Sequence, residues 1–255
     1  PPPPFSSRRR HTRYSLQSRG LGDVYKRQVP HEMSQDDIAR MVESFRSAAL
    51  RAREAGFQIV EIHGAHGYLI HEFYSPTVNQ RTDQYGGSRA ARMRFALEIA
   101  EAVRGVWPDD LPVWFRASAV DGAGIEIEDT VALAQSLKER GIDLIDCSSG
   151  GLATSLALAG SFPGPGFQVP YAKAVRDGAG IATMAVGFIT EPEQAEQILG
   201  DGSADLIALG RELMANPNWV FSAAKALGHP TPHSVLPPSY GFFLERRDAA
   251  MGGSK

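Results

Sequence analysis

The sequence predicts a parallel α/β fold, in which about the last five strand–helix units of an eight-stranded βα barrel are present. Apolar segments that suit strands alternate with segments of helical period along most of the chain. The strand candidates are apolar at nearly every position, which is typical of strands covered on both faces of a parallel sheet. Polar and glycine residues gather where these strands end, and no G-x-G-x-x-G motif opens the first unit, which favours a barrel over a doubly wound sheet.

The first helix and strand carry the clearest local signals. Ser34 suits an N-cap, because Asp36 and Asp37 follow it and apolar residues then recur at helical spacing. Gly56 is expected to end this helix. The nearly continuous apolar segment FQIVEIHGA then predicts the first strand.

The same alternation recurs four more times along the chain. A short helix is expected to begin at Arg211, and a last helix is expected over about 217–227. Five strands cannot close a barrel of eight, so the sequence predicts a barrel fragment. The expected helices cover 88–106, 128–140, 168–177 and 191–199, and the strands that follow them cover 112–118, 144–150, 182–187 and 204–210.

Composition excludes several classes of function. A chain of 255 residues with 43% hydrophobic content can bury a full core, and a net charge of −3 argues against a nucleic-acid binder. The single cysteine, Cys147, excludes a disulfide framework and fits a reducing cytoplasm. No apolar run approaches the roughly 20 residues that a membrane-spanning helix needs. We therefore expect neither a nucleic-acid nor a membrane partner.

Residues 1–28 differ from the rest of the chain. They hold seven of the 26 Lys and Arg residues but one acid, Asp23, and show neither helical period nor strand alternation. We expect a non-native or disordered leader that resembles adapter read-through, with 29–255 as the C-terminal part of the barrel domain. An alternative interpretation makes RRRHTR a nucleic-acid arm or a targeting signal.

The densest polar segment, residues 61–88, carries a family resemblance. The order HGAHGYL, FYSP, NQRTDQYGGS and then Arg92 closely resembles the Old Yellow Enzyme family, in the branch with two histidines. The resemblance runs from about Val29 to the C-terminus, through WFRAS, GIDLIDCSSG, MAVGFIT and ADLIALGRELMANP. Several ordered matches of this length are very improbable by chance, whereas one alone would be weak.

The resemblance implies a TIM (β/α)8 barrel that binds FMN, takes hydride from NAD(P)H and reduces the activated C=C bond of an α,β-unsaturated carbonyl compound. Its carbonyl-binding pair would be His63 and His66, whose N–H groups would stabilise a developing enolate. Tyr68 would donate a proton to the α-carbon after hydride from flavin N5 reaches the β-carbon. Two alternatives stay open: a metal site built from His63, His66 and His71, or histidines with a structural task. We expect no metal.

Arg116 lies inside the apolar run VWFRAS, where an unpaired guanidinium would be costly to bury. The family places such an arginine beside the anionic side of the reduced flavin, near N1 and O2. The alternative is a buried ion pair with Asp146 or Glu61.

The ends of the later strands predict the remaining cofactor contacts. Backbone N–H groups at Gly187 and Gly210, with the Arg211 guanidinium beside them, suit a phosphate, and the family binds the FMN phosphate there. Cys147 is expected in the core. Three residues at the end of the preceding strand are expected to approach the cofactor, although they could merely form a turn: Ser148, Ser149 and Gly150.

Near the C-terminus, PPSYGFFLERR resembles a tail that some members insert into a neighbouring subunit's active site. Tyr240, Phe242 and Arg246 would then line a partner's pocket in a homo-oligomer, and an ordinary solvated tail is the alternative. For the function as a whole, two further alternatives remain. One is a phosphate-binding barrel isomerase or lyase, and the other is an inactive fragment.

Overall fold

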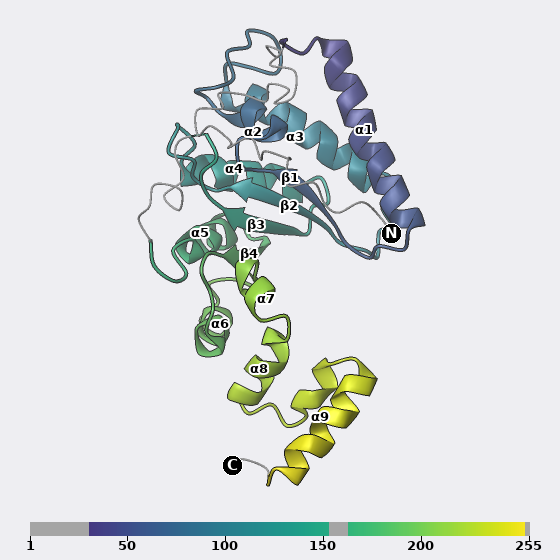
Figure 1. The fold of residues 1–255 in the computed structure, drawn as a ribbon. Coiled ribbons are helices and arrows are strands. Elements are labelled where there is room, and N and C mark those ends of the chain that lie inside the picture. Colours follow the sequence, from purple (N-terminus) through teal and green to yellow (C-terminus); the bar gives the residue numbers. More distant parts are fainter. Residues whose placement is uncertain (1–30, 153–162, 253–255) are drawn as a thin grey trace, which may run out of the picture.

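The computed structural model describes residues 31–152 and 163–252, so the leader predicted at 1–28 lies outside the described residues. The described residues contain a five-stranded parallel sheet with the strand order β1-β2-β3-β4-β5 (Figure 1). Each strand therefore pairs with the next strand in the chain. A barrel wall has this sequential order, whereas a doubly wound sheet reverses its order, so the predicted fold class is confirmed.

Every predicted strand is present, shorter than its apolar segment. Strands and helices alternate, and the helices of adjacent units contact one another, as in the outer layer of a barrel. The strands are β1 (Val60–Gly64), β2 (Val113–Ser118), β3 (Leu144–Ser148), β4 (Ala182–Val186) and β5 (Leu206–Ala208). The helices of these units are α1 (Gln35–Glu54), α2 (Leu69–Tyr74), α3 (Arg89–Arg104), α4 (Ile127–Lys138), α5 (Val169–Ala179), α6 (Pro192–Gly200) and α7 (Arg211–Ala215).

The start of α1 follows the predicted capping signal. The Ser34 hydroxyl accepts a hydrogen bond from the Asp37 backbone N–H, and the Asp37 carboxylate accepts one from the Ser34 N–H at 2.9 Å. Two of the unpaired N–H groups in the first turn are satisfied in this way.

The core lies between the sheet and the helices. Alternate residues of the strands point into it, among them Ile62, Phe115 and Ile145, and these side chains are almost fully buried in one hydrophobic cluster that includes residues of α3 and α4. Cys147 belongs to this layer, as expected, and burial raises the pKa of its thiol. The opposite residues of each strand face the other side of the sheet, where the register aligns His63 with Arg116 and Arg116 with Asp146.

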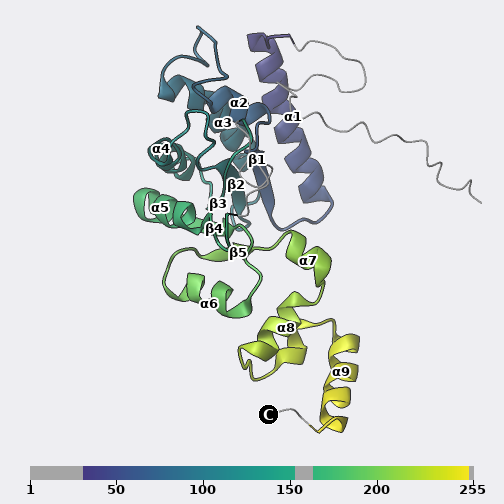
Figure 2. The same ribbon diagram turned by 60° about the vertical axis from the view of Figure 1, so that its left-hand side comes forward.

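The prediction of a last helix at 217–227 was wrong in one respect. That helix is α8 (Trp219–Ala226), but η1 (Pro232–Val235) and α9 (Pro238–Ala250) follow it. Both later helices have proline in their first turn, where its fixed φ favours a helix start. In the two views, α8 and α9 extend away from the sheet beyond α7 (Figure 2).

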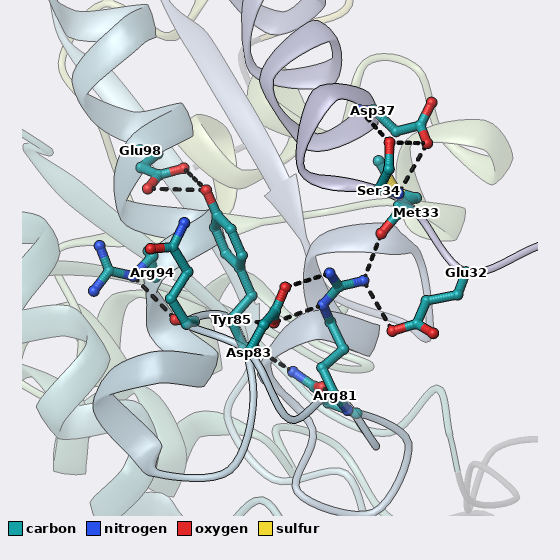
Figure 3. A network of polar contacts seen from close by, with 11 residues as sticks. Glu32, Met33, Ser34, Asp37, Arg81, Asp83, Tyr85, Arg94 and Glu98 are labelled. Carbon is teal, nitrogen blue, oxygen red and sulfur yellow. Dashed lines mark hydrogen bonds and ion pairs between the residues drawn. The ribbon is translucent and has the colours of Figure 1, made fainter.

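The loop between α2 and α3, which holds NQRTDQYGG, is fixed by its own polar side chains (Figure 3). The Arg81 guanidinium donates two hydrogen bonds to the Asp83 carboxylate, at 3.0 and 2.6 Å, and one to the Met33 carbonyl oxygen at 2.7 Å. A Cβ on Gly86 would lie 2.1 Å from the Arg81 carbonyl oxygen, so the loop closes only with glycine there. These motif residues are therefore structural, and they tie the loop to the start of α1.

Candidate active site at the carboxyl ends of the strands

A cavity of about 1030 Å³ lies at the carboxyl ends of β2 to β5. Its volume is at the upper end of the range for small-molecule and cofactor sites. His63 and Tyr68 lie beside it, on the side of His66, and are not part of its lining. The lining includes eight residues that the sequence predicted for the site: His66, Arg116, Ser148, Ser149, Gly150, Gly187, Gly210 and Arg211.

The two predicted histidines and the tyrosine form one cluster. The ring centroid of His63 lies 5.2 Å from that of His66 and 5.5 Å from that of Tyr68. His63 comes from β1, His66 from the turn that follows, and Tyr68 is the N-cap of α2. The Tyr68 side chain is 52% exposed, so its hydroxyl can reach a bound molecule.

His66 has an unusual backbone that its neighbours hold in place. Its φ is +62°, which is uncommon for a residue other than glycine. The His66 N–H donates to the Ser118 hydroxyl at 3.0 Å, and that hydroxyl donates to the Gly150 carbonyl oxygen at 2.7 Å. A Cβ on Gly151 would lie 2.3 Å from the His66 backbone. The turn after β1 and the turn after β3 therefore pack backbone against backbone.

The His66 ring is neutral at neutral pH. Burial lowers its pKa to about 4, with a further contribution from the positive charge of Arg116. Its Nε2 shares a hydrogen bond of 2.7 Å with the Ser148 hydroxyl. Burial and Arg116 also lower the pKa of His63. Two neutral imidazoles can each present an N–H donor without a full charge.

The arrangement of His71 bears on the metal alternative. Its Nδ1 accepts a hydrogen bond from the Gly67 N–H at 2.9 Å, and its Nε2 lies 3.3 Å from Asp121. Both ring nitrogens therefore have protein partners. Among the residues that the structure describes, no group of three His, Cys, Asp or Glu residues is arranged to hold a metal ion.

Arg116 forms an ion pair with Asp146, one of the two partners that the sequence analysis left open. Its Nε lies 3.1 Å from the Asp146 carboxylate, which is almost fully buried. Burial raises the pKa of Asp146 to about 6, against the lowering effect of Arg116. The Arg116 side chain remains 28% exposed and lines the cavity. It can therefore keep Asp146 and still face an anionic group in the cavity.

The far end of the cavity suits a phosphate. The Arg211 guanidinium lies over the Phe188 ring, 4.4 Å from its centroid. A Cβ on Gly210 would meet nothing within 4 Å, so its backbone is open to a ligand. Gly187 has a φ of +127°, which glycine tolerates and other residues rarely adopt. The Arg211 guanidinium beside the open backbone of Gly210 fits the phosphate of FMN.

Sequence reasoning missed Gln168, which joins two strand ends. It is 5% exposed, its amide donates to the Val186 carbonyl oxygen at 3.1 Å, and its Oε1 accepts from the Ser149 hydroxyl at 2.5 Å. Ser149 and Gly150 thus belong to a fixed turn that also lines the cavity. A lone glutamine in PGPGFQVP carries no local signal for such a role.

Comparison with known proteins decides the family. Residues 13–229 match the NADH:flavin oxidoreductase / NADH oxidase family. The chain belongs to this family. Its predicted resemblance to the Old Yellow Enzymes is confirmed, and flavin with a nicotinamide nucleotide is the cofactor pair in the family's name.

Two curated relatives show how much of the family's length is present. The chain is 50% identical over 203 residues to an NADPH dehydrogenase of Geobacillus sp. (strain WCH70) and 49% identical over 209 residues to one of Bacillus subtilis (strain 168). These matches cover 80% and 81% of the chain, but 58% and 60% of the relatives. The chain therefore spans about three fifths of the relatives' length.

Solved structures of similar fold include two reductases. A complex of 2-naphthoyl-CoA reductase with 2-naphthoyl-CoA matches with a TM-score of 0.70 and 27% identity, over 81% of this chain and 32% of that one. Morphinone reductase in complex with tetrahydroNAD matches with a TM-score of 0.61 and 29% identity, over 79% of this chain and 52% of that one.

The C-terminal segment is a helix rather than an irregular tail. Tyr240 and Phe242 of α9 are 65% and 49% exposed, and the Arg246 guanidinium lies 4.4 Å from the Phe242 ring centroid. Asp248 joins α9 to Lys225 and His233 at 2.8 and 3.1 Å. Insertion of these residues into a partner's pocket stays a prediction. No described helix is long and apolar enough to cross a membrane.

Proposed function

We propose that the protein is an FMN-dependent ene-reductase that uses NAD(P)H to reduce the C=C bond of α,β-unsaturated carbonyl compounds. The observation that carries the proposal is the cluster of His63, His66 and Tyr68 beside a cavity that also contains two arginines. FMN, when bound there, would supply the hydride transfer between NAD(P)H and the β-carbon of the substrate.

The chain's own residues divide the remaining work. Arg211 and the open backbone at Gly210, together with Gly187 at the end of β4, hold the phosphate of the cofactor. Arg116 offsets negative charge near the flavin ring, while Asp146 keeps its guanidinium in place. Ser148, Ser149 and Gly150 line the same cavity as the two arginines and contact the bound cofactor.

His63 and His66 bind the carbonyl oxygen of the substrate. Their neutral rings donate hydrogen bonds that strengthen as negative charge develops on that oxygen. In the structure Ser148 is bonded to the Nε2 of His66, so an incoming oxygen takes the place of this hydroxyl. Tyr68, exposed at the start of α2, donates its phenolic proton to the α-carbon.

The test separates the two half-reactions. Hydride transfer from NAD(P)H needs no proton from Tyr68, whereas alkene reduction needs both hydride and proton. Tyr68→Phe should leave flavin reduction nearly unchanged and slow enone reduction about 10²–10⁴-fold, as expected for loss of a positioned acid. Stopped-flow absorbance of the flavin measures both steps.

Tyr74→Phe is a matched control. It also removes a phenol hydroxyl, that of the last residue of α2, but this hydroxyl is buried and has no hydrogen-bond partner among the described residues. It should reduce enones at the parent rate. If Tyr68→Phe does the same, with unchanged stereochemistry, the proton comes from another source and the role of Tyr68 is wrong.

Bound flavin distinguishes the alternatives. A phosphate-binding isomerase or lyase would leave His63, His66 and Tyr68 without a task and would not be yellow. An inactive chain would likewise be colourless after purification with added FMN. The visible absorbance of oxidised flavin, retained through gel filtration, excludes both.

A further inference from the structure

His71 and Asp121 form a buried pair beneath the turn that carries His66 and Tyr68. Their side chains are 1% and 0% exposed. The reaction proposed above gives neither of them a role. A buried histidine–carboxylate pair is costly unless its hydrogen bonds are satisfied, so its partners indicate its task.

The hydrogen bonds of the pair determine which ring nitrogen of His71 carries the proton. The Gly67 N–H donates to His71 Nδ1 at 2.9 Å, so this nitrogen carries a lone pair. The ring proton is then on Nε2, which faces Asp121 Oδ2 at 3.3 Å. The other carboxylate oxygen of Asp121 accepts from the N–H groups of Ala123 and Ile125, at 2.7 and 3.0 Å. This chain of bonds links the turn after β1 to the loop after β2.

The turn needs such an anchor. His66 has a φ of +62°, a conformation that a non-glycine residue keeps only where its surroundings hold it. The Ser118 hydroxyl accepts a hydrogen bond from the His66 N–H, and Nδ1 of His71 accepts one from the next N–H, that of Gly67. Because Gly67 lies between His66 and Tyr68, its position sets the direction of both side chains.

We propose that His71 and Asp121 are positioning residues, which fix His66 and Tyr68 for substrate by keeping His71 in its Nε2–H tautomer. The inference rests on the proposed function of His66 and Tyr68. Asp121 selects the tautomer because its carboxylate only accepts hydrogen bonds. In this tautomer, Nδ1 of His71 can accept the hydrogen bond from the Gly67 N–H, and this bond keeps the turn of His66 and Tyr68 in place.

Asp121→Asn tests this with little change in volume. The amide oxygen can keep the bonds to Ala123 and Ile125, while the amide N–H₂ faces His71 and favours a proton on Nδ1. That proton would point at the Gly67 N–H, so the anchor is lost. Histidine ¹⁵N NMR of the FMN-loaded protein should show the Nε2–H tautomer of His71 in the parent and the Nδ1–H tautomer in the variant.

The functional readout is the affinity for 4-hydroxybenzaldehyde, a phenol that His63 and His66 would bind. Asp121→Asn should weaken this affinity about tenfold, because the hydrogen bond that positions the His66 turn is lost. Asp143→Asn is the control, since Asp143 also accepts a backbone N–H, that of Val113, but lies at the opposite end of the strands. Its affinity should equal the parent's.

Two outcomes would overturn the inference. One is an Nδ1–H tautomer of His71 in the parent, which needs no variant and holds even if Asp121→Asn does not fold. The other is an unchanged phenol affinity in a variant whose tautomer has switched. A parent that shows the Nε2–H tautomer but reduces no enone would instead contradict the proposed function.

Discussion

Single residues in this site depend on partners that are far away in the sequence. Ser118 bonds both the His66 N–H and the Gly150 carbonyl oxygen, and Gln168 bonds Ser149 and the carbonyl oxygen of Val186. Each of these buried polar side chains joins two strand ends. These four hydrogen bonds join uncharged groups, while the two arginines line the cavity.

Arg211 is the residue whose role in cofactor binding is most open to test. Arg211→Ala should weaken FMN binding about 10- to 100-fold, since a charge-assisted contact with phosphate contributes about 1.5–3 kcal/mol. Arg211→Lys should lose less, because it keeps the charge but not the planar fork. Fluorescence titration of the apoprotein with FMN gives the dissociation constants.

Lys225→Ala serves as the control for this prediction. Lys225 is also a cation over an aromatic ring, 5.6 Å from the Phe221 centroid, but it lies on α8 outside the cavity lining. Its loss should leave FMN affinity unchanged. Equal affinities for the parent and Arg211→Ala would show that the phosphate binds elsewhere.

At the residue scale, the sequence predicted the site residues that lie close to one another along the chain. His63, His66 and Tyr68 lie within six residues, so their convergence could be inferred from one strand end. The partners of His71 could not, because Asp121 lies 50 residues away in a loop without a recognisable pattern. Long-range hydrogen bonds between loops have no period or spacing that a sequence displays.

At the scale of elements, glycine determines how closely two loops approach. Gly151 has a φ of +118°, and a Cβ there would lie 2.3 Å from the His66 backbone. Gly151→Ala should therefore lower the free energy of unfolding by about 1–3 kcal/mol beyond the cost of the positive φ alone, as overpacking usually does. It should also weaken phenol binding, because the His66 turn must move.

The matched comparison is Gly56→Ala at the end of α1. Gly56 also has a positive φ, +84°, but a Cβ there would meet nothing within 4 Å. Urea denaturation gives the free energy of unfolding of both variants, and the difference between their losses is the cost of the steric clash at Gly151. If both lose the same stability, and phenol affinity is unchanged, then the contact between the two loops contributes nothing.

Elements were predictable where the chain itself carries the signal. The cap at Ser34 fixed the start of α1, and buried apolar segments located all five strands. The short α2 and the late α9 were missed. The first has six residues, too few for a helical period, and the second begins in a proline-rich segment that resembles a tail.

At the scale of the whole molecule, the sheet has two open edges among the described residues. β1 pairs only with β2 and β5 only with β4, whereas a closed barrel leaves no strand edge. The edge strand β5 also exposes Leu206, at 39%. An unpaired edge with an apolar side chain is a template for pairing with another chain, so the 255-residue chain should self-associate.

This last prediction concerns that edge. Leu206→Lys places a charge on β5, which natural proteins use to discourage pairing between edges, and should shift the chain towards monomer. Val220→Lys is the control, because Val220 is 53% exposed but lies on α8, away from any strand edge. Sedimentation velocity over a range of concentrations should show association for the parent and Val220→Lys, and less for Leu206→Lys. A parent that stays monomeric throughout, or two lysine variants that behave alike, would mean that the edges of the sheet do not drive association.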